Sequence, residues 1–534
     1  MSGNLFKSLA TVSGMTMASR VMGFARQVLI AGVIGAGGNP VADAFWAAFR
    51  LPNMFRRLFA EGAFQAAFVP LFQGKLISED KAAAKQFAEE VLSVLLFVLL
   101  ALTALVEIAA PLFVHLVASG FSDDPEKFDL TALYLRIMFP YLACMSMVGL
   151  LSGVLNSLDR FMAYAGAPLL LNICQIAAIL LYADGEIDVT GEALAWATAI
   201  SGFLQLGLLV WGASRQGYLL KLRRPRMTPG VKRLLVLGGP GFLSAGATQI
   251  NIIIGTNIAS QQPGAVSWLL NADQLYQLPL AVVGTALGVV LLPMLSRRVK
   301  EGDETGAMHA INRSLELSAV MTLPAAAAFM LMAAPICDAL FRGFATDALS
   351  LFGGRASAFT EEDVKWTGWA LAIYGAGLPA FVWQRVFAPA FFAREDTRAP
   401  MNYALIAIGV NTALALALFP TFGFRAVAVA TVFAAWLQVA QLAWNLRKRG
   451  QFHLDKRLRK RAPSIVAATG ALAIFIFFVL PHADAMAGVL FGRYWAAIIA
   501  IAVGGVIVYA AALLALGGVR FSDYKAYGRN RETF

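Results

Sequence analysis

Long runs of apolar residues dominate this sequence and limit its fold more than any other feature. A helix needs about 20 mostly apolar residues to cross a bilayer, and many stretches reach that length. The apolar residues run continuously instead of alternating with polar ones, which argues against a transmembrane β-barrel. We therefore predict an all-α polytopic membrane protein with about fourteen transmembrane helices, at residues 5–34, 41–73, 87–118, 128–155, 162–183, 192–213, 234–260, 267–295, 310–341, 366–393, 400–419, 425–446, 463–481 and 493–517.

The composition supports a lipid environment. Of the 534 residues, 59% are hydrophobic and 14% are charged, whereas soluble domains average about 45–50% and about 25%. Arg20 and Arg26 interrupt the first apolar run, so this run does not resemble a cleavable signal peptide. The cysteines lie in apolar segments without the spacing of a metal site or a disulfide framework. We interpret them as buried thiols; they are Cys144, Cys174 and Cys337.

Basic residues are concentrated in alternate loops. The loops on the side of the N-terminus carry 30 Lys and Arg, and the opposite loops carry 6. Cytoplasmic loops show such an excess, so both termini are predicted to be cytoplasmic. The net charge of +11 and the basic runs at 221–233 and 447–461 leave a nucleic-acid surface as an alternative. Anionic lipid explains the same runs more simply, and we predict no nucleic-acid partner.

A weak internal repeat divides the chain. Leu158-Asp159-Arg160 followed by Ala167-Pro168 matches Arg394-Glu-Asp396-Thr-Arg398 followed by Ala399-Pro400. The offset of about 230 residues corresponds to about six helices, so the copies have the same orientation and form a parallel pseudo-repeat. We predict two six-helix lobes with a cavity between them, plus two extra C-terminal helices and a basic cytoplasmic tail. The predicted boundaries are 1–223, 224–450 and 451–534.

Once the loop residues are counted, the seven basic residues that remain inside the predicted helices are all arginine. Arginine keeps its charge, and at the bilayer centre it costs at least about 2.5 kcal/mol. In the second helix, four charged residues are spaced 7, 7 and 4 apart and share one face: Asp43, Arg50, Arg57 and Glu61. The first helix has a polar face with Thr16, Ser19, Arg20, Gly23 and Arg26. The seven helix arginines are Arg20, Arg26, Arg50, Arg56, Arg57, Arg136 and Arg385.

Two interpretations of these arginines remain open. They are either structural ion pairs and interfacial side chains, or a binding surface for an anion. The surplus of positive over negative charge in these helices favours the second interpretation. Arginine suits a phosphate ligand, because the guanidinium group binds two phosphate oxygens at once. The four histidines are scattered, and we predict no metal site and no cofactor.

The same region resembles a known family. Ser13-Gly-Met-Thr16, Ser19-Arg20-Val-Met-Gly23-Phe-Ala-Arg26, Phe49-Arg50-Leu-Pro52-Asn53 and Arg56-Arg57-Leu-Phe-Ala-Glu61-Gly62 are similar to the N-terminal motifs of the MurJ/MviN lipid II flippases. Asp396-Thr-Arg398-Ala-Pro400 resembles a later motif of that family. The resemblance implies a fold of the multidrug/oligosaccharidyl-lipid/polysaccharide exporter superfamily in the bacterial inner membrane. It also implies movement of lipid II, an undecaprenyl-pyrophosphate precursor of peptidoglycan, from the cytoplasmic to the periplasmic leaflet by alternating access.

The resemblance also implies which residues bind the substrate. They are Ser19, Arg20, Arg26, Asp43, Arg50, Arg57 and Glu61, together with Asp273 and Gln274. The family usually has Ala-Asp-Arg where this chain has Ala272-Asp273-Gln274, so an arginine expected in the C-terminal lobe is missing. The seventh helix offers Thr248, Gln249 and Asn251 but no carboxylate for a sodium site. Lipid II, membrane lipids and other cell-wall synthesis proteins are the implied partners.

Three rival functions follow from the same pattern. A drug or cation antiporter of this architecture needs acidic or aromatic cavities, whereas the excess charge inside the predicted helices of this chain is positive. A flippase for another polyprenyl-linked oligosaccharide, such as O-antigen, differs only in the N-terminal motifs. A membrane glycosyltransferase or phosphatase needs an outer-face carboxylate site, and the candidates Asp123-Asp124 and Glu361-Glu362-Asp363 look like solvated loop charges. We therefore predict a transporter and not an enzyme.

Overall fold

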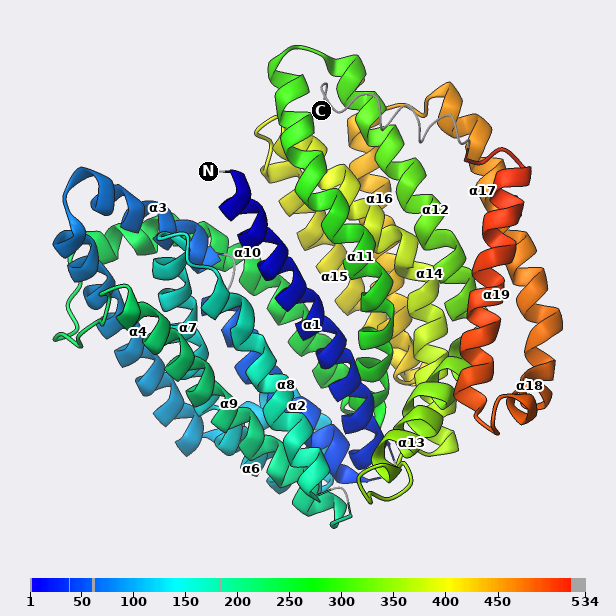
Figure 1. The fold of residues 1–534 in the computed structure, drawn as a ribbon, viewed down its shortest axis with the longest axis horizontal. Coiled ribbons are helices and arrows are strands. Elements are labelled where there is room, and N and C mark those ends of the chain that lie inside the picture. Colours follow the sequence, from blue (N-terminus) through cyan, green and yellow to red (C-terminus); the bar gives the residue numbers. More distant parts are fainter. Residues whose placement is uncertain (1, 38, 60–62, 183, 520–534) are drawn as a thin grey trace. The chain divides into compact units, whose positions relative to one another are not determined.

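A computed structural model describes residues 2–37, 39–59, 63–182 and 184–519, and helices make up nearly all of this part of the chain (Figure 1). The elements in chain order are α1 (Ser2–Ile34), α2 (Pro40–Phe59), α3 (Ala63–Ser78), α4 (Lys81–Ile108), α5 (Ala110–Val117), η1 (Ser119–Asp123), α6 (Pro125–Met138), α7 (Pro140–Asn156), α8 (Met162–Tyr182), α9 (Ile187–Arg215), α10 (Pro229–Ala259), α11 (Ala265–Lys300), α12 (Glu304–Cys337), η2 (Asp338–Phe344), α13 (Ala345–Ser350), α14 (Glu361–Phe392), α15 (Arg398–Phe422), α16 (Arg425–Lys448), α17 (Lys456–Val479), η3 (Leu480–His482), α18 (Ala483–Val489) and α19 (Tyr494–Ala515).

Each predicted membrane helix corresponds to one helix or to a consecutive pair. The second prediction, 41–73, covers α2 and α3, and the third covers α4 and α5. The fourth covers α6 and α7, which meet at Pro140, where a missing N–H interrupts helical hydrogen bonding. Among the described residues, ten segments are long and apolar enough to cross a membrane. These findings confirm the all-α polytopic class.

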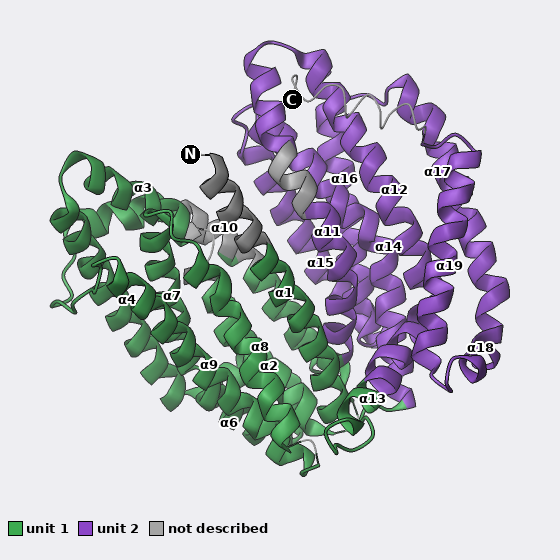
Figure 2. Ribbon diagram, viewed as in Figure 1, with its two compact units in different colours: residues 1–267, 345–360 green, residues 268–344, 361–534 purple. Residues whose placement is uncertain are grey.

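The chain folds into two compact units, which Figure 2 distinguishes by colour. Unit 1 contains 1–267 and 345–360, and unit 2 contains 268–344 and 361–534. The predicted boundary at 223/224 therefore differs from the division in the structure. The reason is that α10 packs against α2, α3, α4 and α5 of unit 1. The segment with α13 also joins unit 1, where it contacts α1.

Both units use the same helix pairs, as the sequence repeat predicts. In unit 1, α9 packs against α7 and α8, and in unit 2, α16 packs against α14 and α15. The matched turns between these helices also share their backbone geometry. Asp159 and Glu395 are both left-handed, with φ of 56° and 60°. The N–H of the following residue, Arg160 or Asp396, bonds back to Leu155 or Phe391. These features support the parallel repeat.

Aromatic side chains form part of the core of unit 1. Phe64, Phe68 and Phe72 recur every fourth residue of α3, so they share one face of that helix. Their rings are stacked, and Phe68 also stacks on Phe87 of α4 with ring centroids 5.6 Å apart. Phe72 contacts Tyr218, which lies just after α9. This packing joins α3, α4 and the segment leading to α10.

The C-terminal helices α17 and α19 belong to unit 2, where both pack against α12. A buried ion cluster at the start of α17 holds it there. Glu316 of α12 accepts hydrogen bonds from Arg313 and from Arg461, at 2.6 Å from Arg461 Nη1. Arg457 lies 3.4 Å from the same carboxylate. Asp455 caps α17 through the Leu458 N–H and also binds Arg313.

Candidate functional site

The polar face of α1 is fixed by one asparagine of α8. Asn172 is buried, and its Oδ1 accepts a hydrogen bond from Arg26 Nη1 at 3.0 Å. Its Nδ2 donates to the backbone carbonyl of Ser19 at 3.0 Å. Asn172 therefore contacts α1 at two positions two turns apart and orients the Arg26 guanidinium. An amide provides both the donor and the acceptor that this arrangement needs.

Arg20 lies on the same helix but in different surroundings. Its side chain is exposed, and it makes no hydrogen bond or ion pair with any residue that the structure describes. Arg57, at the end of α2, is exposed and likewise has no partner among the described residues. These two arginines therefore have charge and hydrogen-bonding capacity available for an external anion.

Burial decreases along the charged face of α2. Asp43 in the first turn is 0% exposed, Arg50 is half-buried and Arg57 is exposed. Glu61, the fourth predicted member, lies outside the described residues. Arg56, one position from this face, donates to Asn53 of its own helix at 3.0 Å. The described part of the stripe thus runs from the protein interior at Asp43 to an accessible surface at Arg57.

Asp43 is held by four protein groups. Its carboxylate accepts hydrogen bonds from the Gly264 N–H at 2.7 Å, the Ser267 N–H at 3.0 Å and the Ser267 hydroxyl at 2.7 Å. Lys127 of α6 lies 3.7 Å away and supplies the opposite charge. A carboxylate is stabilised at the positive end of a helix, here the start of α11. These contacts account for Asp43 without a substrate.

In unit 2, the predicted residues Asp273 and Gln274 lie half-buried on α11. Asp273 accepts a hydrogen bond from Gln277 of the same helix. Arg385 of α14 approaches the same helix at Gly284. A Cβ added to Gly284 would lie 2.5 Å from Arg385 Nη1, so the arginine side chain packs directly over this glycine. Unit 2 therefore has an exposed helix arginine beside the helix where Gln274 replaces the expected one.

The acidic outer segment at the start of α14 is not uniformly solvated. Asp363 is fully buried and accepts a hydrogen bond from Trp268 Nε1 at 2.7 Å. The interpretation of this residue as a solvated loop charge was wrong, because α14 begins at Glu361 and turns its third residue inward. Glu361 remains exposed and lies 3.6 Å from Arg342.

Sequence reasoning missed two partners of the site and treated a third residue too lightly. Asn172 and Lys127 carry no distinctive spacing, and their roles depend on which helices pack together. Arg385 lies inside a predicted membrane helix. The free-energy cost of a charge in that position could alone have marked it as a functional candidate. Among the described residues, no three His, Cys, Asp or Glu side chains gather as metal ligands. The cysteines are free thiols, with Cys144 and Cys337 buried and Cys174 half-buried.

Comparison with known proteins identifies the family. The model of the lipid II flippase MurJ family matches residues 30–495. The chain belongs to the lipid II flippase MurJ family. A probable lipid II flippase MurJ of Rhizobium meliloti is 46% identical over 89% of this chain and 86% of its own length. The lipid II flippase MurJ of Burkholderia cenocepacia is 36% identical over 84% of each chain.

Solved structures support the fold of this MurJ-family chain. A structure named lipid II flippase MurJ in an inward closed conformation matches with a TM-score of 0.75, at 23% identity over 94% of this chain and 97% of that one. A multidrug resistance MATE family transporter of the MOP superfamily matches with a TM-score of 0.66, at 16% identity over 83% and 98%. With its apolar helices, the chain is a multi-pass bacterial inner-membrane protein.

Proposed function

We propose that this chain flips lipid II from the cytoplasmic to the periplasmic leaflet of the inner membrane. Membership of the MurJ family is the observation that carries the proposal. The mechanism is alternating access through a cationic central cavity, without a catalytic step. Other cell-wall synthesis proteins are proposed partners, because they supply and consume the substrate.

The diphosphate of lipid II is the proposed ligand of the arginines. Arg20 and Arg57 present exposed guanidinium groups, and Arg50 lies between interior and surface on the face it shares with Arg57. Arg26 contributes a charge whose direction is fixed by Asn172. Charge-assisted hydrogen bonds of this kind contribute about 1.5–3 kcal/mol each. Asp43 takes a supporting role, because it holds the start of α2 against α6 and α11.

Unit 2 is proposed to contribute Arg385 in place of an arginine at 274. Asp273 and Tyr276 would orient neighbouring polar groups of the substrate. A drug or cation antiporter is disfavoured by this second exposed arginine, because like charges repel a cationic ligand. Membrane potential is a proposed source of work, since each charge that crosses 100 mV gains about 2.3 kcal/mol.

The decisive experiment measures lipid II on the outer leaflet of cells. The chromosomal copy is depleted while a plasmid supplies either the natural chain or a variant. Arg20→Ala is expected to leave lipid II inaccessible from outside, as in depletion alone. Arg136→Ala is the matched control, because Arg136 is an exposed helix arginine bound to the Glu107 carbonyl at 3.1 Å. Normal outer-leaflet lipid II after complete depletion would overturn the proposed function.

A further inference from the structure

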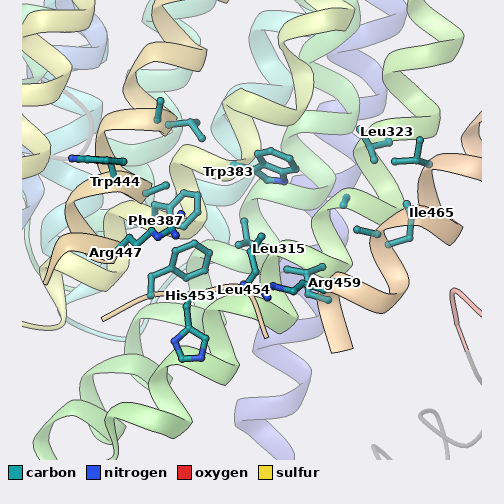
Figure 3. A pocket seen from close by; sticks show the side chains of 18 residues that line it. Leu315, Leu323, Trp383, Phe387, Trp444, Arg447, His453, Leu454, Arg459 and Ile465 are labelled. Carbon is teal, nitrogen blue, oxygen red and sulfur yellow. The ribbon is translucent and has the colours of Figure 1, made fainter. Parts of the chain in front are cut away.

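A large apolar pocket lies within unit 2, and none of the residues assigned to the substrate lines it. It has a volume of about 580 Å³ and is lined by side chains of α12, α14, α16 and α17 (Figure 3). Leu315, Phe387, Trp444 and Val466 are part of its apolar wall. Trp444 is 70% exposed and Val466 is 60% exposed. An apolar cavity that opens beside exposed apolar side chains is suited to a hydrocarbon chain from the bilayer.

Two arginines give this pocket a basic rim. Arg447 lies in the last turn of α16 and Arg459 lies near the start of α17, and Figure 3 shows them on opposite sides of the pocket. Neither makes an ion pair with a residue that the structure describes. Both are exposed. The pocket therefore combines an apolar interior with positive charge at one end.

Neighbouring arginines differ from these two in having acidic partners. Arg449 binds Asp396 at 2.8 Å, and Arg461 binds Glu316 at 2.6 Å. The chain thus gives carboxylate partners to Arg449 and Arg461, each two positions from a pocket arginine, but none to Arg447 and Arg459, the arginines that line the pocket. A negatively charged ligand would supply the missing partner. The difference points to a ligand whose charge sits at the rim and whose apolar part fills the pocket.

We propose that this pocket binds an anionic phospholipid, with one acyl chain among α12, α14, α16 and α17 and the phosphate between Arg447 and Arg459. Basic pockets between transmembrane helices on the cytoplasmic side recognise such headgroups. The rim belongs to the most basic loop of the chain, 447–461, which the charge bias assigns to the cytoplasm. All the lining residues belong to unit 2, so this site is separate from Arg20 and Arg50. The proposal goes beyond lipid II transport and does not depend on it.

Lipid titration of the full chain tests this site. The purified, delipidated protein in detergent is titrated with phosphatidylglycerol, phosphatidylcholine or undecaprenyl phosphate, and bound lipid is counted by native mass spectrometry. Phosphatidylglycerol is expected to bind most tightly. Arg447→Ala with Arg459→Ala is expected to weaken it about 30-fold, from about 1 kcal/mol for each basic residue. Lys456→Ala with Lys460→Ala removes the same charge from the same region outside the pocket and is expected to have little effect.

A second pair of variants tests the apolar part of the site. Ala443→Phe fills the pocket without changing charge, and Ala467→Phe places the same ring on the exposed face of α17. Only the first is expected to displace phosphatidylglycerol, with thermal unfolding showing that both proteins are folded. The proposal would be overturned if the lysine pair and the arginine pair lost phosphatidylglycerol affinity equally, or if phosphatidylcholine bound as tightly as phosphatidylglycerol. It would also be overturned if Ala443→Phe had no effect on phosphatidylglycerol binding. Tighter binding of undecaprenyl phosphate would assign the pocket to a polyprenyl lipid instead and would also overturn it.

Discussion

Asp43 and Arg50 lie seven residues apart on one face of α2, and the structure gives them different surroundings. Asp43 has its charge compensated by Lys127 and three hydrogen bonds. Arg50 is half-buried, further along the helix toward the exposed Arg57. A residue whose bonds are all within the protein stabilises the fold, whereas a partly exposed cation can exchange water for a ligand. The two positions are therefore expected to fail in different ways when substituted.

Arg50→Ala is expected to abolish lipid II transport without unfolding the protein. The loss of one charge-assisted contact corresponds to about 10- to 100-fold weaker diphosphate binding. Arg50→Lys should recover only part of this, because an ammonium group lacks the two-oxygen grip. The measurements are complementation of a depleted strain, lipid II binding to purified protein, and thermal unfolding. Asp43→Ala should instead lower the unfolding temperature, and adding it to Arg50→Ala should not restore transport. Full activity of that double variant would show that Arg50 serves only an ion pair.

Asn172 offers a separate test of the Arg26 charge. Asn172→Ala removes both bonds to α1 and is expected to destabilise the protein by about 1–3 kcal/mol. Asn172→Asp keeps an acceptor for Arg26 and pairs its charge but loses the donor to the Ser19 carbonyl. Lipid II binding is expected to fall, and thermal unfolding measures the stability lost with that bond. Ile173→Ala, at the neighbouring exposed position of α8, is the control. If Asn172→Asp binds and transports lipid II normally, the charge of Arg26 has no role in substrate binding.

The sequence predicts a residue's role only where that role does not depend on which residues pack around it. The sequence marks the arginines of α1 and α2 as candidates, because an uncompensated charge in an apolar segment is costly wherever it packs, and their role in binding stays a prediction. The sequence does not predict the burial of Asp363, because the first turn of α14 decides whether this carboxylate contacts water or Trp268. The Glu316 cluster joins residues about 140 positions apart, and no local pattern in the sequence reports such a contact.

At the scale of elements, apolar run length predicted where helices lie but not where they break or pack. The breaks between α4 and α5 and between α6 and α7 fall inside single predicted spans. The connection from α9 to α10 was predicted as a loop between lobes, yet it is fastened to α4. The Lys221 N–H and Arg223 Nε bind the carboxylate of Glu89 at 3.1 and 2.7 Å. The Thr228 hydroxyl donates to Glu90 at 2.8 Å.

Releasing the connection between α9 and α10 from α4 should make it easier for a protease to cleave. Glu89 is buried and is the shared acceptor for the segment 221–223, so Glu89→Ala removes two contacts at once. Trypsin cleavage of purified protein after the basic residues at 221–226 is expected to become about tenfold faster, because local opening costs less free energy. Glu79→Ala, which breaks only an exposed pair with Lys75, is the control. Equal cleavage of the two variants would mean that the Glu89 contacts do not hold the connection on α4.

At the scale of the whole molecule, the sequence repeat and the observed units agree on architecture but not on boundaries. The matched pairs α9 with α8 and α16 with α15 show that the repeat determines packing inside each unit. The assignment of α10 and of 345–360 to unit 1 depends on contacts between distant segments. A repeat in sequence specifies equivalent helices, whereas the boundary of a unit depends on which neighbours each helix finds.

The orientation of the whole chain follows from the charge bias and can be tested directly. Lys and Arg concentrate on one set of loops by 30 to 6, and an error of one helix would destroy this asymmetry. In a variant with Cys144, Cys174 and Cys337 replaced by serine, Arg226→Cys and Glu361→Cys place single thiols at exposed positions on the two sets of loops. A membrane-impermeant maleimide applied to intact spheroplasts is expected to label Glu361→Cys at once. Arg226→Cys should be labelled only after permeabilisation. Labelling of Arg226→Cys from outside would place the basic loops in the periplasm and reverse the proposed direction of transport.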